Sequence, residues 1–479
     1  MTHQVAQNTA FLTLASVGQK IIAFVYFLFV ARVMMPQATG EYFLAVSITV
    51  IYTVVADLGV TPVVIREVAK DPAHAAKLLS QALSIKLPLL VLASVGAVVT
   101  GRLLNYSPEL QYLILLACVV LSLDALHLLF YGVLRGFQRL RYESLGVFTG
   151  QLVTGLVGGI VLWRAPSLPL LVVALMAGSL TNVVVAGYNI VKRLGARALQ
   201  PAFDRIACRR ILIAAFPFAL AALFVKMYSY VDSILISKFL DTTAVGIYAL
   251  AYKFTYAFQF LPLAFTAALY PGMSAVIGKD PAELERIFLK GMWYMAMLAT
   301  PIVLGLSAIA PEVVRLAGEG YSQAAMVLSV LVFVLIPIFL DFPVGSLLNA
   351  SGRQATKTAI MGVTMLINVV LNLLLVPRLG IMGAVTAALA CFCFMFVAGL
   401  FFVPKLIPTF RLRHLAGILL PIFSSGVVMF LAVLLTKPFV GWIFVIPLGA
   451  AIYLALLLFT KSLHLDDLRF LLKSVRPRV

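Results

Sequence analysis

The stretch KIIAFVYFLFVARVMMPQATGEYFLA, residues 20–45, returns in altered form as KMYSYVDSILISKFLDTTAVGIYALA, residues 226–251. When the two are aligned without gaps, Lys20 falls on Lys226, and the later Gly-Glu-Tyr falls on Gly-Ile-Tyr. The apolar part of each copy is close in length to the roughly 20 residues that cross a bilayer as a helix. The correspondence indicates that the chain contains one membrane-embedded unit twice.

The repeat continues beyond these stretches once a few inserted residues are allowed. KLPLLVLASVGA, around Pro88, aligns with TPIVLGLSAIA, around Pro301, and LRGFQR (134–139) aligns with LNASGR (348–353). Each copy then holds six helices, and an even number of crossings orients both copies the same way across the bilayer. We therefore expect two parallel lobes around a central cavity. The expected lobes are 1–205 and 206–403, followed by two additional helices and a basic tail in 404–479.

The composition places the whole chain in a membrane. Of its 479 residues, 63% are hydrophobic and 11% are charged, whereas roughly 45 to 50% of the residues of a soluble domain are apolar. Apolar runs of spanning length recur along the sequence, about fourteen of them by the usual length criterion. The expected fold class is an all-α polytopic membrane protein with about fourteen transmembrane helices.

The net charge of +18 is explained by topology rather than by a nucleic acid partner. Lys and Arg gather in alternate loops, most densely between Val191 and Arg210, whereas the opposite loops hold few of them. Because short basic loops stay in the cytoplasm, we expect both termini on the cytoplasmic side of the inner membrane. These loops also attract anionic lipid headgroups, so membrane lipids are expected partners.

Lys20 lies inside an apolar helix, where an ionisable side chain normally faces protein or a watery cavity. It precedes Arg32 by about 18 Å along the helix, so its ammonium group cannot reach the end that Arg32 occupies. Reaching the cytoplasmic interface instead is an alternative for one lysine. The matching Lys226 favours two lysines on opposing walls of one cavity, where they would flank an anion such as a diphosphate.

Other ionisable side chains also fall within apolar helices: Asp57, Lys86, Asp124, His127, Asp232, Lys253 and Asp341. Asp124 and His127 are three residues apart on one helix face, where they would either relay a proton or form a buried pair that holds helices together.

Asp57 is followed by Gly59 and Pro62, which would loosen the helix before Arg66. The loosened segment is either a bending point or a structural kink. No metal site is expected, because Cys391 and Cys393 have no His or carboxylate nearby and suit small buried positions better.

Three further segments are ADLGVTPVVIREVA (56–69), YSYVDSILISKFLDTTAVGIYALAYKF (228–254) and LLNASGRQATKTAIMGVTMLINVVLNLLLVPRLGIMGAVTAALA (347–390). In the last, Asn368 and Asn372 precede a Pro-Arg-x-Gly turn and a Gly-Ala continuation. With these segments the chain resembles the polysaccharide transporters of the O-antigen flippase (Wzx-type) group. That group belongs to the multidrug/oligosaccharidyl-lipid/polysaccharide (MOP) exporter superfamily.

The resemblance implies a flippase, not an enzyme, that moves a lipid diphosphate-linked oligosaccharide from the cytoplasmic to the outer leaflet by alternating access. Candidate substrate-binding residues are Lys20, Arg32, Lys86, Lys226, Lys238 and Lys253, and candidate coupling or gating residues are Asp57, Arg66, Asp124, His127, Asp232 and Asp341. The phosphate-binding pattern G-x-x-x-x-G-K-[ST] is absent, so a proton or cation, the membrane potential or the substrate gradient would drive transport.

Alternatives stay open within the superfamily. A multidrug/organic-cation antiporter would need a cavity dominated by carboxylates, and a peptidoglycan-precursor flippase would share the diphosphate chemistry. A membrane-embedded ligase or polymerase would call for a long outer loop, which the sequence lacks. We expect a monomer without a bound cofactor, working beside glycan polymerase or ligase machinery.

Overall fold

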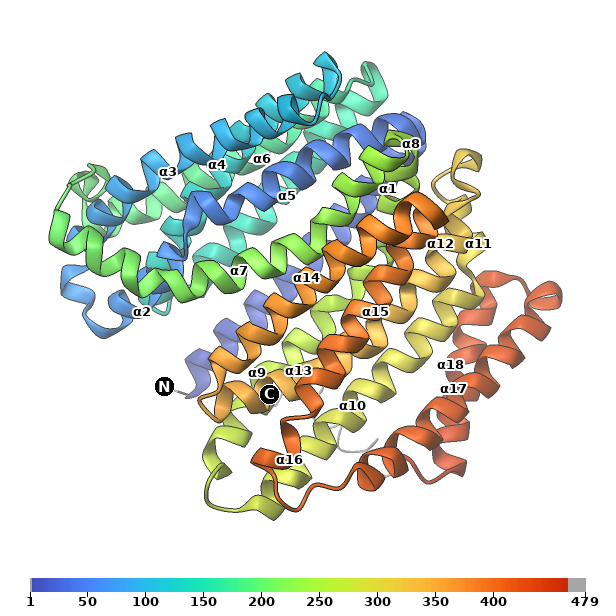
Figure 1. Ribbon diagram of the computed structural model, residues 1–479. Coiled ribbons are helices and arrows are strands. Elements are labelled where there is room, and N and C mark those ends of the chain that lie inside the picture. The colour runs from blue at the N-terminus through green and yellow to red at the C-terminus, as the bar shows by residue number, and fades with distance from the viewer. Residues whose placement is uncertain (1, 464–479) are drawn as a thin grey trace. The chain divides into compact units, whose positions relative to one another are not determined.

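The structure, a computed structural model, describes residues 2–463, which form helices and connecting turns without any strand (Figure 1). The first half contains α1 (Thr2–Asp57), α2 (Val60–Lys70), α3 (Ala75–Leu103), α4 (Pro108–Gly136), α5 (Leu140–Arg164), α6 (Leu168–Leu194), α7 (Arg205–Phe239), α8 (Thr242–Tyr256) and α9 (Phe260–Val276). The second half contains α10 (Pro281–Ala308), α11 (Ala310–Arg315), α12 (Ala324–Leu331), α13 (Leu335–Ala350), α14 (Gln354–Leu379), α15 (Ile381–Leu400), α16 (Val403–Leu406), α17 (Leu412–Val440) and α18 (Trp442–Phe459). The end of the expected basic tail lies outside the described residues.

Twelve helices in the described part of the chain are long and apolar enough to cross a membrane. The expected class, an all-α polytopic membrane protein, is therefore confirmed. The length and composition criteria identify twelve candidate spans, two fewer than the expected fourteen or so. The expected number therefore stays a prediction.

The first of these twelve candidates, Val17–Asp57, contains a sharp break. Met35 has the left-handed φ of 64°, and Pro36 follows it. Gln19 and Val46 nevertheless line the same cavity, although a straight helix would separate them by about 40 Å. The chain therefore turns back at Met35, and α1 contains two antiparallel segments.

A second break follows Asp57, where the sequence predicted a loosened helix. Leu58 and Gly59 have φ values of 43° and 75°, and α2 starts directly after them. A Cβ atom on Gly59 would lie 2.3 Å from the Ala215 carbonyl oxygen, so glycine lets the turn approach α7 closely. Pro62, by contrast, lies within the first turn of α2 and does not interrupt it.

Two glycines that correspond in the repeat make a reciprocal backbone contact. A Cβ atom on Gly40 would lie 1.8 Å from the carbonyl oxygen of Thr242, and one on Gly246 would lie 1.9 Å from that of Pro36. Pro36 and Thr242 also correspond in the repeat. Each copy thus offers the same surface to the other, which is the signature of a local twofold relation.

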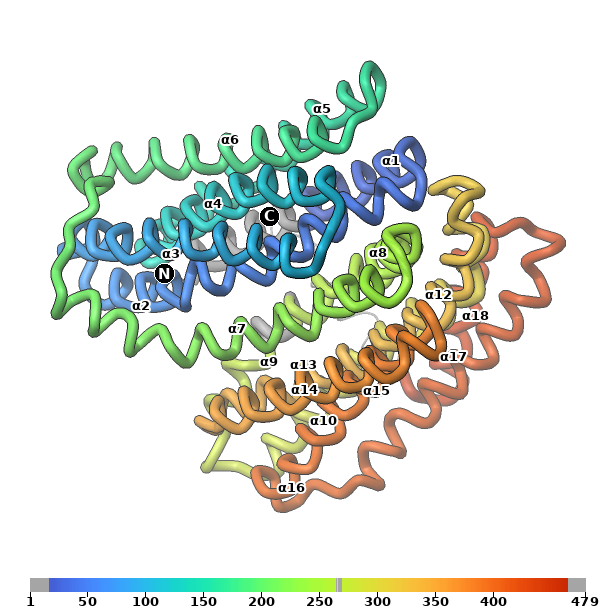
Figure 2. The backbone as a smooth tube through the Cα atoms, turned by 45° about the horizontal axis from the view of Figure 1, so that its top comes forward, coloured from blue at the N-terminus to red at the C-terminus, as the bar shows by residue number. Residues whose placement is uncertain are grey.

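The chain divides into two compact units. Unit 1 comprises Met1–Leu250, Leu316–Tyr321 and Met365–Ala384, and unit 2 comprises Ala251–Arg315, Ser322–Thr364 and Val385–Val479. Within unit 1, α3, α4 and α6 run side by side, as Figures 1 and 2 show. Within unit 2, α17 packs against α10 and α18. The lobe bounds expected from the repeat stay a prediction.

Candidate functional site

The basic side chains expected to bind a diphosphate differ in exposure. On α1, Lys20 and Arg32 are both exposed. On α7, Lys226 is half-buried with its Nζ 5.7 Å from the centre of the Tyr230 ring. Among residues 2–463, no ion pair joins Lys20, Arg32 or Lys226 to a carboxylate. Their positive charge is therefore available to an anion.

Lys238, near the end of α7, is tied to the neighbouring turn of unit 1. Its Nζ donates to the Leu104 carbonyl oxygen and lies 3.9 Å from the centre of the Tyr106 ring. Lys238 as a whole remains exposed. A cation over an aromatic ring is held in place without losing its charge.

Lys86 is the basic candidate that the structure places in a different role. Its side chain is fully buried, with Nζ 2.5 Å from Asp57 Oδ1 and 3.1 Å from Thr61 Oγ1. The Thr61 hydroxyl also donates to the same carboxylate oxygen. A buried ammonium that is already neutralised has no charge left for a substrate. Lys86 and Asp57 therefore hold α3 to the end of α1.

Three further candidates, Arg66, Lys253 and Asp341, belong neither to the unpaired basic side chains nor to the Lys86–Asp57 pair. Arg66 is exposed on α2 and pairs with Glu67 at 2.8 Å. Lys253 and Asp341 belong to unit 2, where both are half-buried and Asp341 interacts electrostatically with Lys357.

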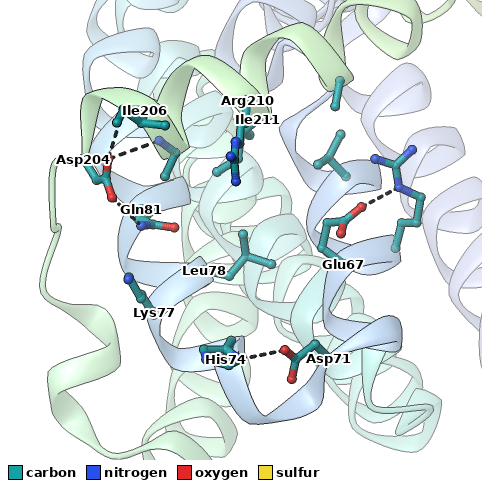
Figure 3. A pocket seen from close by; sticks show the side chains of 14 residues that line it. Glu67, Asp71, His74, Lys77, Leu78, Gln81, Asp204, Ile206, Arg210 and Ile211 are labelled. Atoms are coloured by element: carbon teal, nitrogen blue, oxygen red, sulfur yellow. Dashed lines mark hydrogen bonds and ion pairs between the residues drawn. The ribbon is translucent and has the colours of Figure 1, made fainter.

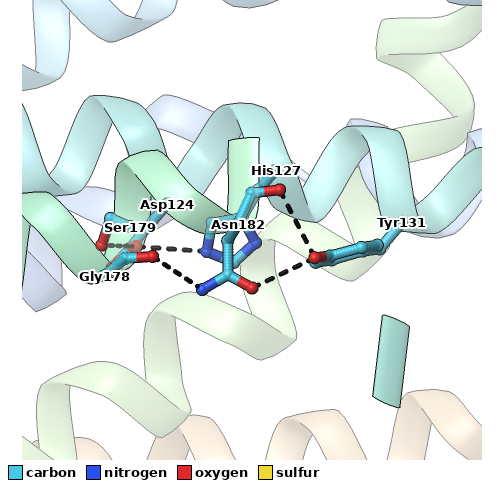
Figure 4. Close-up of polar contacts among 6 residues, drawn as sticks. All are labelled: Asp124, His127, Tyr131, Gly178, Ser179 and Asn182. Atoms are coloured by element: carbon cyan, nitrogen blue, oxygen red, sulfur yellow. Dashed lines mark hydrogen bonds and ion pairs between the residues drawn. The ribbon is translucent and has the colours of Figure 1, made fainter. Parts of the chain in front are cut away.

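Asp124 and His127 of α4 form a polar network with α6, shown in Figure 4. Asp124 Oδ1 accepts a hydrogen bond from the Ser179 hydroxyl at 2.5 Å and lies 3.1 Å from His127 Nε2. Nearby, the Tyr131 hydroxyl donates to Asn182 Oδ1 at 3.1 Å. The predicted contact between Asp124 and His127 is therefore present.

A cavity of about 440 Å³ inside unit 1 is lined by four members of this network: Asp124, His127, Ser179 and Asn182. Gln19, Thr49 and Thr154 contribute to the same walls, and the volume suffices for several waters. The Asp124 side chain is 40% exposed, whereas His127 Nδ1 is buried without a partner in the described residues. A carboxylate and an imidazole in contact at a cavity wall are groups between which a proton can pass.

A second carboxylate, Asp232 on α7, is buried far more completely. It is 3% exposed and accepts hydrogen bonds from the Tyr248 hydroxyl and the Asn372 amide, both at 2.8 Å. Asn372 also donates to the carbonyl oxygen of Asn368, one turn earlier on α14. No basic side chain within the described residues forms an ion pair with Asp232. The buried carboxyl group thus rests on neutral hydrogen-bond donors alone, which makes it a candidate to bind a proton or a small cation.

The side-chain oxygens of Asn368 and Asn372 support this interpretation. Both Oδ1 atoms are buried and lack a hydrogen-bond donor in the described structure. Buried polar atoms are normally satisfied, and each exception calls for an explanation. Carboxylate and amide oxygens together are ligands for a hard cation, so the group around Asp232 is chemically suited to hold one.

Sequence reasoning found the charged members of these clusters and, among the neutral ones, named only Asn368 and Asn372. It did not single out Ser179, Asn182 or Tyr248, because single hydroxyl and amide groups are common in apolar helices. The spacing of Asn368 and Asn372, which puts both on one face of an apolar helix, was the available signal. Cys391 is buried as expected, but Cys393 is exposed.

Comparison with known proteins confirms the resemblance. Residues 5–277, more than half of the chain, match the polysaccharide biosynthesis protein family, and residues 217–374 match the MatE family. The probable flippase AglR of Haloferax volcanii is 26% identical over 58% of this chain and 58% of its own length. The chain thus matches little more than half the length of that relative.

Two further proteins match over a larger share of the chain. The probable low-salt glycan biosynthesis flippase Agl15 of Haloferax volcanii is 22% identical over 81% of both chains. The lipid II flippase MurJ, in an inward closed conformation, has the same fold, with a TM-score of 0.78 and 14% identity over 94% of this chain and 99% of its own. The chain therefore belongs to the polysaccharide biosynthesis protein family, a family of transporters rather than enzymes.

Proposed function

We propose that this protein is a flippase for a lipid diphosphate-linked oligosaccharide, such as an O-antigen or another polysaccharide repeat unit. It accepts the lipid from the cytoplasmic leaflet, holds the diphosphate with basic side chains and releases the glycan at the outer leaflet. The names of AglR and Agl15 support a flippase of glycan biosynthesis.

The observation that carries the proposal is the set of basic side chains without a carboxylate partner. Lys20 and Lys226 lie within candidate membrane spans, where an ionisable group is costly and normally has a function. Lys86 is the contrast, since Asp57 neutralises it. A diphosphate that leaves water needs cations to offset its lost hydration, and these lysines meet that need.

The proposed topology has fourteen crossings. The reversal at Met35 divides the first candidate span into two crossings, and α8 with α9 supplies another, because together they form a nearly continuous helix from Thr242 to Val276. With the basic loops inside, both termini lie in the cytoplasm. The reciprocal contact of Gly40 and Gly246 supports two parallel lobes related by a twofold axis.

Two acidic groups within apolar helices are the proposed coupling sites. Asp124 and His127 are in contact and line the cavity of about 440 Å³, so together they are suited to pass a proton. Asp232 lacks a basic partner in the described chain and lies beside two unsatisfied amide oxygens, so it is suited to a proton or a monovalent cation. Either group would link the gradient to the conformational cycle.

A multidrug/cation antiporter is the second candidate, favoured by the partly exposed Asp124 carboxylate on the cavity wall. The fold shared with MurJ keeps a peptidoglycan-precursor flippase as a third, since its substrate is also a lipid diphosphate. Sensitivity to organic cations would identify the second candidate, and the glycan carried would identify the third.

Surface glycan display tests the proposal in cells that lack the native gene. Lys20→Gln with Lys226→Gln should abolish display at normal protein abundance, and the corresponding Arg pair should retain part of it. Lys192→Gln with Lys279→Gln removes the same charge from exposed positions and should leave display unchanged. Full display with the first pair would contradict the proposal.

A further inference from the structure

A second cavity, of about 530 Å³, lies where α2, α3 and α7 meet in unit 1 (Figure 3). Polar side chains line it together with apolar ones such as Val63, Leu78 and Ile211. It shares no lining residue with the cavity at Asp124. The proposed transport mechanism gives it no role.

The carboxylates around this cavity are already occupied. Glu67 pairs with Arg66 at 2.8 Å, and Asp71 pairs with His74 at 2.6 Å. The hydrogen bond from His74 lowers the pKa of Asp71 below its ordinary value, so this carboxylate stays ionised and engaged. Asp204 caps the first turn of α7 through the backbone N–H groups of the residues that follow it. Glu67 and Asp71 are thus paired with basic side chains, whereas Asp204 is held by backbone N–H groups and the Gln81 amide.

Two cations of the cavity lack such partners. Lys77 of α3 and Arg210 of α7 line it, and Figure 3 shows each side chain on its helix. Within residues 2–463 neither side chain makes an ion pair or a side-chain hydrogen bond. An ammonium and a guanidinium offer eight N–H donors between them. An anion with several oxygens, such as a phosphate, matches this pair.

An apolar strip begins at the same cavity. Ile206 is both a lining residue and 69% exposed, and Ile213 and Phe216 continue along α7 with 63% and 65% exposed. From Ile206 to Phe216 the helix rises about 15 Å, half of the roughly 30 Å hydrocarbon core. A phosphate bound at Lys77 and Arg210 would therefore lie at one end of an apolar surface whose length equals the thickness of one leaflet.

We propose that this cavity binds an anionic phospholipid of the adjacent leaflet, with its phosphate between Lys77 and Arg210 and an acyl chain along α7. Basic side chains near a membrane surface attract anionic headgroups, and the donor pair adds a defined position for the phosphate. Under the proposed topology, this is the cytoplasmic leaflet. The bound lipid would join α2, α3 and α7 at the end where α7 starts.

The test uses the full-length protein in a neutral detergent and does not depend on transport. Native mass spectrometry would count bound phosphatidylglycerol, phosphatidylcholine and glycerol 3-phosphate during titration. We expect phosphatidylglycerol to bind at least tenfold more tightly than either of the others. Lys77→Gln with Arg210→Gln should weaken it tenfold or more, whereas Lys77→Arg with Arg210→Lys should preserve most of the affinity.

The matched control removes the same charge elsewhere. Lys279→Gln with Arg353→Gln changes one exposed lysine and one exposed arginine of unit 2 and should alter affinity less than twofold. An equal loss in both Gln pairs would overturn the site, because net charge alone would then explain binding. Glycerol 3-phosphate binding as tightly as the phospholipid would overturn the acyl-chain contact and identify a site for free phosphate.

Discussion

Breaking the pair between Lys86 and Asp57 is the change whose cost the structure defines best. Lys86 is fully buried, and Lys86→Met would keep its apolar stem while leaving the Asp57 carboxylate without its counter-charge. Removing one partner of a buried ion pair costs about 3–5 kcal/mol. Because 27% of the Asp57 side chain is exposed and Thr61 still donates to it, we expect the lower end, about 3 kcal/mol.

A double-mutant cycle isolates the pair from other effects of substitution. Asp57→Asn with Lys86→Met removes both charges, so its cost should fall about 2 kcal/mol short of the sum of the single changes. The assay is equilibrium unfolding in mixed micelles, followed by tryptophan fluorescence. If the costs of the two single variants sum to the cost of the double variant within about 0.5 kcal/mol, the two side chains are not energetically coupled and the prediction is refuted. Normal transport by the double variant would assign the pair to structure rather than coupling.

Asp232→Asn keeps the shape of a group that Tyr248 and Asn372 contact, so transport by reconstituted protein should lose its dependence on a proton or sodium gradient while the melting temperature holds. Wild-type gradient dependence would exclude Asp232 as the coupling group. His127→Gln should slow transport while the melting temperature holds, and an unchanged transport rate would leave the contact with Asp124 purely structural. Gly40→Ala should cost about 1–3 kcal/mol by overpacking, because its Cβ would lie 1.8 Å from a carbonyl oxygen. Gly159→Ala is the control in the same thermal-unfolding measurement, because a Cβ at Gly159 meets no atom within 4 Å.

Composition and the internal repeat sufficed to predict the fold class. Apolar runs of spanning length have few alternatives to helix, because a bilayer leaves every backbone N–H and C=O to be satisfied within the segment. The repeat also predicted which glycines correspond, and Gly40 and Gly246 meet in a reciprocal contact. The reversal at Met35 was harder to place, since its left-handed backbone depends on packing rather than on a residue with that preference.

The candidate site was predictable in its charges and not in their partners. An ionisable residue in an apolar helix is visible in the sequence, but whether another residue neutralises it depends on packing between helices. Lys20 and Lys86 look alike in sequence, yet Lys20 is exposed and Lys86 is paired with Asp57. The neutral partners of Asp232 come from α8 and α14, and Asn372 is more than a hundred residues away from Asp232 in the sequence. No local spacing in the sequence links these residues.

The repeat itself points to specialisation of the second copy. Asp232 and Tyr248 correspond to Tyr26 and Tyr42 in the first copy. All four side chains are buried. The first copy packs two tyrosines at these positions, so close packing there does not require a carboxylate. The carboxylate at Asp232 adds a charge that packing does not require, which supports its proposed role in coupling.

The most direct test of the account measures lipid translocation in proteoliposomes. The substrate is a polyprenyl-diphosphate oligosaccharide, and its transfer between leaflets is followed for the wild type, Lys20→Gln with Lys226→Gln, and Lys20→Arg with Lys226→Arg. The account predicts rapid transfer by the wild type, none by the Gln pair and an intermediate rate for the Arg pair, because the anion needs charge first and geometry second. Transfer by the Gln pair at the wild-type rate would contradict the claim that these lysines bind the diphosphate.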